Sequence, residues 1–102
     1  NSNAPRIEDM EKIPELIKNV QPDPAWLKYA HFQGSVLLEA EIDTQGNVIR
    51  ACVVHGHPLV REYALKALLQ YIYRPYILDG KPSPARFLVK INFNYSNYHK
   101  ED

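Results

Sequence analysis

The feature that most constrains the fold is a regular alternation of apolar and polar residues near the C-terminus, from Ala85 to Tyr95. Successive side chains of a β-strand point to opposite faces, so this period of two predicts a strand with one buried and one wet face. A sheet that keeps one wet face is typically antiparallel. The positions expected on the inner face are Ala85, Phe87, Val89, Ile91, Phe93 and Tyr95, and those on the wet face are Arg86, Leu88, Lys90, Asn92 and Asn94.

Two more strands are predicted upstream, joined by a tight turn. Ser35 to Asp43 alternates in the same way, and Val48 to His55 is the return strand. Between them, Gly46 and Asn47 can adopt the positive φ that hairpin turns need. The return strand is expected to place Ile49, Ala51 and Val53 on one face and Arg50 and Cys52 on the other.

Prolines and apolar spacing predict the helices. Pro58 favours the first turn of a helix that continues to about Tyr71, and a second, short helix is expected from Pro24 to about His31. A third, short helix is expected over Ile13 to Lys18. The main helix is expected to bury one stripe, made of Leu59, Tyr63, Ala64, Ala67, Leu68 and Tyr71.

These elements predict an α+β fold: a two-layer sandwich in which two helices cover one face of a three-stranded antiparallel sheet, in the order α-β-β-α-β. The length of 102 residues suits one domain. We expect an N-terminal extension over residues 1–19, the domain over 20–95 and a polar tail over 96–102. No apolar run approaches the roughly 20 residues of a membrane helix, so any anchor is expected upstream.

The composition argues against several classes of function. Twelve basic residues balance twelve acidic ones, which is unlike a nucleic-acid-binding surface. Cys52 is the only cysteine, so it allows neither an internal disulfide nor a cysteine zinc site, and it is expected to be a buried or half-buried small residue. His55 and His57 lack an obvious third metal ligand. Glu39 and Glu41 are expected on a solvated face, and no phosphate-binding glycine loop is present. We therefore predict a binding domain without catalysis, metal or cofactor.

Six short motifs follow one another along the chain in a fixed order. They are Gln21-Pro22 with Pro24, Gln33-Gly34-Ser35-Val36, Ile42-Asp43 with Gly46-Asn47-Val48, Gly56-His57-Pro58-Leu59, the stretch from Ala64 to Tyr76, and Asp79-Gly80-Lys81-Pro82. In this order and spacing they resemble the C-terminal domain of the TonB energy-transducer family. The resemblance covers about residues 20–95, and Asp23 and Tyr71 are two positions where the family usually has Tyr and Trp.

The resemblance implies a periplasmic domain anchored to the inner membrane by an upstream helix and driven by proton-powered motor proteins of that membrane. Such domains bind the N-terminal peptide of outer-membrane TonB-dependent transporters by β-strand addition. The last strand is the family's pairing edge, which here implies Arg86, Leu88, Lys90, Asn92 and Asn94 as partner-binding residues. Gln21 and Pro22 are implied near the partner as well.

Two alternatives remain open at the level of sequence. The edge of the last strand could be covered by the N-terminal segment or by a second copy of the chain, which would make a homodimer. The domain could also be an accessory interaction module of an envelope sensor, a peptidase or a Tol-type bridging protein.

Overall fold

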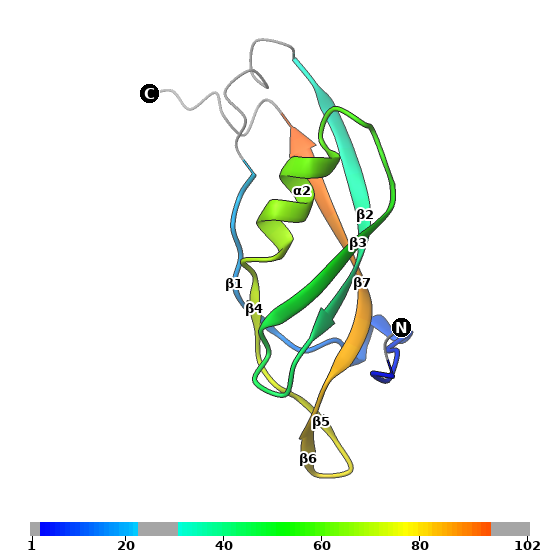
Figure 1. Ribbon diagram of the computed structural model, residues 1–102, viewed down its shortest axis with the longest axis vertical. Coiled ribbons are helices and arrows are strands. Elements are labelled where there is room, and N and C mark those ends of the chain that lie inside the picture. Colours follow the sequence, from blue (N-terminus) through cyan, green and yellow to red (C-terminus); the bar gives the residue numbers. More distant parts are fainter. Residues whose placement is uncertain (1–2, 23–30, 95–102) are drawn as a thin grey trace.

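The computed structural model describes residues 3–22 and 31–94 of the chain (Figure 1). They form an α+β fold in which one α-helix packs against a three-stranded antiparallel sheet of order β3-β2-β7. In chain order the elements are the 3-10 helix η1 (Met10–Lys12), β1 (Leu16–Lys18), β2 (Gln33–Ile42), β3 (Val48–Gly56), α2 (Arg61–Leu68), β4 (Ile72–Tyr73), β5 (Tyr76–Leu78), β6 (Lys81–Ser83) and β7 (Ala85–Asn94).

The three predicted strands of the sheet are confirmed. β2 pairs with β7 without interruption, from Gln33 opposite Asn94 to Ile42 opposite Ala85. The alternation of β7 is confirmed as well, since its inner positions are buried or half-buried and Lys90 and Asn92 are exposed. The predicted two-helix cover is not confirmed, because most of the helix expected from Pro24 lies outside the described residues.

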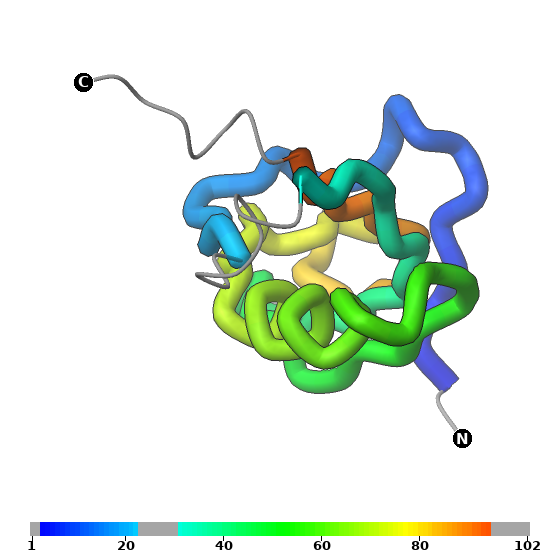
Figure 2. The backbone as a smooth tube through the Cα atoms, turned by 90° about the horizontal axis from the view of Figure 1, so that it is seen from above, coloured from blue at the N-terminus to red at the C-terminus, as the bar shows by residue number. Residues whose placement is uncertain are grey.

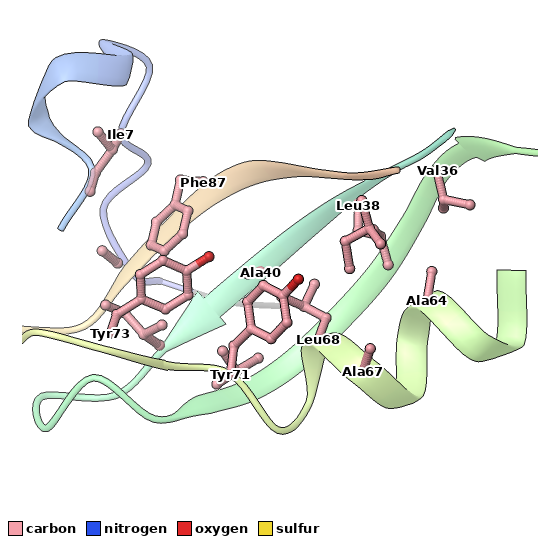
Figure 3. Close-up of a cluster of buried hydrophobic side chains, with 14 of the residues drawn as sticks. Ile7, Val36, Leu38, Ala40, Ala64, Ala67, Leu68, Tyr71, Tyr73 and Phe87 are labelled. Atoms are coloured by element: carbon pink, nitrogen blue, oxygen red, sulfur yellow. The ribbon is translucent and has the colours of Figure 1, made fainter. Parts of the chain in front are cut away.

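The hydrophobic core lies between α2 and the inner face of β2 and extends along β7. Figure 3 shows Ala64, Ala67 and Leu68 of α2 packed against the β2 side chains, with Tyr73 beside Phe87. The Tyr73 and Phe87 rings meet edge to face at 5.0 Å between centroids. Leu68 is fully buried, as predicted for the main helix.

The main helix is shorter than predicted. It begins at Arg61 because the preceding residues form a turn, in which the backbone N–H of Val60 donates to the His57 carbonyl at 3.1 Å. Leu59 therefore lies outside the helix and is 60% exposed, which contradicts its predicted burial. At the other end, Tyr71 donates its N–H to the Leu68 carbonyl, and β4 follows directly after this tight turn.

The helix predicted over Ile13 to Lys18 is wrong. Pro14 disfavours the helical conformation in Ile13, and the segment extends to form β1, which pairs with β4. The apolar residues whose spacing suggested a helix do not form one buried face. All three residues of β1 are exposed, and the flanking Ile13 is half-buried. The side chain of Arg74 binds Glu15 at 2.9 Å and reinforces this pairing.

The hairpin between β2 and β3 is fixed by its turn. Gly46 has φ of 90°, whereas Asn47, expected to share that property, does not. The Asp43 carboxylate accepts the backbone N–H groups of Gln45 and Asn47 at 2.9 and 3.0 Å. Burial acts to raise the pKa of Asp43, but the N–H groups of Asn47 and then Gln45 outweigh it, so this pKa lies below its ordinary value of 3.8. The turn also pairs with β4, where Tyr73 donates its N–H to the Gly46 carbonyl at 2.8 Å.

The second predicted turn, at Asp79 and Gly80, is confirmed with φ values of 53° and 79°. It joins β5 and β6, a short hairpin that extends beyond the main sheet in Figure 1. The sequence did not predict these two strands, because each is only three residues long and Pro82 lies within the second.

Candidate strand-addition edge

β7 is an edge strand of the sheet, and its backbone polar groups alternate between β2 and the outer side. Arg86 shows which residues of β7 point these groups to the outer side. Its N–H donates to the Pro5 carbonyl and its carbonyl accepts the Ile7 N–H, both at 2.8 Å. Arg86 therefore points its polar backbone away from β2. Because this direction repeats every second residue, the N–H and C=O groups of Leu88, Lys90 and Asn92 point outward too.

The N-terminal segment, residues 4–13, covers only one end of this edge. Arg6 pairs with Arg86 in a parallel bridge, and the Arg86 Nε also donates to the Ala4 carbonyl at 3.0 Å. Asp9 then accepts the Glu11 N–H at 3.0 Å and caps η1, and among the described residues no β-bridge to β7 follows that of Arg6. Figure 2 shows this segment, in dark blue, passing the molecule on a different side from α2.

Three ion pairs lie on the outer face of the sheet, and the two that Glu39 makes join the N-terminal segment and β7 to β2. The Oε2 of Glu39 lies 3.8 Å from both the Arg6 Nε and the Arg86 Nη1, and the Oε1 of Glu41 lies 3.4 Å from the Arg50 Nε. The side chains of Glu39 and Glu41 are only 25% and 13% exposed. The expectation of a solvated face is therefore wrong, because the arginines cover these carboxylates.

The opposite edge, β3, differs in regularity. Its register against β2 shifts twice, which leaves Val54 and Ile49 as extra residues in two β-bulges. Both are about half exposed, whereas Val48 is buried. Cys52 is exposed, so the expectation that it is buried or half-buried is wrong. A bulged edge presents its donors and acceptors out of line and is a poor template for another strand.

The predicted partner-binding residues fall into two groups. Leu88, Lys90 and Asn92 are exposed on β7, and Arg86 is half-buried with its backbone already paired. The Asn94 Oδ1, at the end of the strand, accepts a hydrogen bond from the Gln33 side chain at 3.3 Å.

Gln21 and Pro22 form the second group. They follow β1, which pairs with β4 rather than with β7. Gln21 is exposed and Pro22 is buried. Within the described ranges, strand pairing does not bring these two residues to the β7 edge.

One feature near the edge has no signal in the sequence. A surface groove of about 360 Å³ opens where the N-terminal segment leaves β7. Its apolar lining comes from two distant parts of the chain, which the pairing of Arg6 with Arg86 and the packing of Ile7 against the core bring together. The lining residues are Arg6, Ile7, Glu8, Met10, Ile13 and Leu88.

The histidines and acidic residues form no metal centre in the described part of the chain, where no three His, Cys, Asp or Glu side chains gather. The Nδ1 of His57 accepts the Leu59 N–H at 3.1 Å, and its ring meets that of Phe32 edge to face at 5.3 Å. His57 thus organises the turn before α2. Among the described helices, none is long and apolar enough to cross a membrane.

Comparison with known proteins agrees with this architecture. Residues 24–95 match the family described as Gram-negative bacterial TonB protein C-terminal. The chain is also 33% identical over 84 residues to Protein TonB of Vibrio cholerae serotype O1 (strain ATCC 39315 / El Tor Inaba N16961), which covers 78% of this chain and 34% of that protein. The chain thus spans about a third of the length of this relative. The family match extends over most of the chain, and this protein therefore belongs to the TonB C-terminal domain family.

Proposed function

We propose that this chain is the periplasmic, non-catalytic C-terminal domain of a TonB-like energy transducer, and that β7 captures the N-terminal peptide of an outer-membrane transporter by strand addition. The observation that carries the proposal is the contrast between the regular β7 edge and the bulged β3 edge. Leu88, Lys90 and Asn92 offer outward N–H and C=O groups in line, and main-chain hydrogen bonds supply much of the affinity in this mode of binding.

The proposed role also includes transmission of force from inner-membrane proton motors, which would act through a segment upstream of this domain. The pairing of β7 supports such a role. Ten residues of β7 pair with β2, whereas an added strand would use only the outward groups that remain beyond Arg86. Under load along the strands, the captured peptide is therefore expected to separate before β7 leaves the sheet.

Amide hydrogen exchange tests the capture step. The chain is compared with and without a synthetic peptide that corresponds to the N-terminus of a TonB-dependent transporter from the same organism. We expect slower exchange at the amides of Leu88, Lys90 and Asn92, which face outward. The amides of Val89 and Ile91 provide an internal control, because they already face β2.

The amide of Arg86 is expected to change little, because it already donates to Pro5. Protection centred on β3 would show that the wrong edge has been chosen. No protection on either edge, at a peptide concentration that saturates binding, would remove strand addition as the mode of capture.

A further inference from the structure

The groove beside Leu88 lies in line with the β7 edge. Leu88 contributes its side chain to the lining of the groove, and its backbone is the first outward-facing one beyond the segment that pairs with Arg86. A strand added to β7 therefore passes this groove at the position paired with Leu88.

The apolar walls of the groove are of two kinds. Ile7 is buried and Ile13 is partly buried against the core, so these side chains are held by the fold. Met10 and Leu88 are 79% and 43% exposed, so they have surface available for a partner. Arg6 and Glu8 supply a polar margin.

The pairing of Arg6 shows where the side chain of an added residue lies. Arg6 is opposite Arg86, and both guanidinium groups approach the same Glu39 oxygen at 3.8 Å. Paired residues of neighbouring strands thus place their side chains on the same face of this sheet. By the same rule, a peptide residue opposite Leu88 places its side chain beside that of Leu88.

We propose that this groove is a specificity pocket for the captured peptide, and that it receives one large aliphatic or aromatic side chain at the position paired with Leu88. The inference rests on the proposed strand addition and deepens it. Continuity with the β7 edge identifies the occupant as the peptide, and a volume of about 360 Å³ is ample for one such side chain. The N-terminal segment thereby acquires a binding role, because it builds one wall of the pocket and bridges β7 at Arg86, next to the outward groups proposed for the peptide.

The test uses the same transporter peptide, labelled with a fluorophore, and measures Kd by anisotropy. Leu88→Ser and Met10→Ser are each expected to weaken binding by about tenfold, which corresponds to losing the burial of part of one apolar side chain. Ile77→Ser is the matched control: Ile77 is 55% exposed on the β5–β6 hairpin, outside the groove, and its replacement should leave Kd unchanged. All three side chains are exposed, so the unfolding midpoint should confirm that each variant folds.

The peptide is varied in parallel by replacing each large apolar residue with Ser. One of these replacements should weaken binding to the parent chain and have little further effect on Leu88→Ser, because the two changes remove the same contact. Equal Kd values for all variants, with protection of Lys90 and Asn92 still present, would overturn the pocket and leave strand addition intact. No protection in the parent chain would refute both.

A second copy of the chain is the competing occupant. Sedimentation of the peptide-free chain is expected to show a monomer, and Met10→Ser should not alter it. A dimer that dissociates on Met10→Ser or Leu88→Ser would assign the groove to self-association and overturn its assignment to the peptide.

Discussion

The two edges of the main sheet have the same neighbour, β2, but different geometry. β7 follows β2 in one uninterrupted register, whereas β3 slips by one residue at each of two bulges. A regular strand aligns its unpaired N–H and C=O groups at a spacing that another strand can match. A bulge breaks this alignment and increases the local twist. The ability to accept a partner is therefore a property of each edge and not of the sheet as a whole.

The edges also differ in how they are protected. At β7, the N-terminal segment occupies Arg86, and Lys90 places a charge on the strand. These features limit indiscriminate pairing, and Leu88, Lys90 and Asn92 are exposed within the part of the chain that the structure describes. At β3, Gly56 lies so close to Val36 that an added Cβ would come within 2.8 Å of a Val36 methyl carbon. The strand thus ends in a glycine packed tightly against β2, and its two bulges disrupt the regularity of its outer edge.

The largest effect that would sharpen this comparison comes from proline at two adjacent positions of β7. Ile91→Pro removes an N–H that faces β2 and truncates a core contact, so it should cost about 3 kcal/mol or more of unfolding free energy. Lys90→Pro removes an N–H that faces outward, so the domain should stay folded and lose peptide binding by more than tenfold. Urea unfolding and peptide titration measure the two properties.

The different effects expected for the two proline variants depend on which N–H groups of β7 face outward, and that assignment was made from the hydrogen bonds of Arg86. If Lys90→Pro unfolds the chain as severely as Ile91→Pro, the inner and outer directions of β7 have been assigned incorrectly. Lys90→Ala is the control for the lost charge, and it should keep most of the affinity because the backbone is unchanged.

The next prediction compares the stability cost of replacing the glycines in the turns that lead to the two edges. Gly46 and Gly80 both have positive φ, but an added Cβ at Gly46 would lie 1.8 Å from the Tyr73 carbonyl oxygen, and at Gly80 it would meet nothing within 4 Å. Gly80→Ala should cost about 1–2 kcal/mol from backbone strain alone. Gly46→Ala should cost several kcal/mol, because the hairpin must also move away from β4. Equal thermal unfolding midpoints for the two variants would show that β4 does not hold the β2–β3 hairpin.

The smallest effect concerns the Asp43 carboxylate in the same hairpin. Its pKa is lowered in the folded chain, so its stabilisation is present above the unfolded pKa and is lost as the pH falls through the folded value. Asp43→Asn should therefore cost about 1 kcal/mol at pH 7, and the difference from the parent chain should shrink as the pH falls below 3.8. Urea midpoints at pH 7 and pH 3 provide the measurement. A difference that is the same at both values would show that the charge of Asp43 is not involved.

The strands and turns of the sheet could be predicted because their signals are local. Alternation in Ala85–Asn94 reflects the pleat of a half-buried strand, and Gly46 and Asp79-Gly80 mark positions where the backbone needs positive φ. The same signals, in their order along the chain, point to the family. The helix predicted over Ile13 to Lys18 was wrong because apolar spacing alone does not show that Leu16 and Lys18 pair with β4, a strand more than 50 residues away in the chain.

Local sequence patterns were sufficient to predict the three-stranded sheet and the core position of Leu68. The tertiary structure was needed to show which backbone groups of β7 face outward, that the N-terminal segment occupies Arg86, and that Met10 lies near Leu88. These properties depend on the register between segments far apart in the chain. Local sequence patterns do not encode that register, because a shift of one residue exchanges the two faces of a strand while leaving its alternation unchanged.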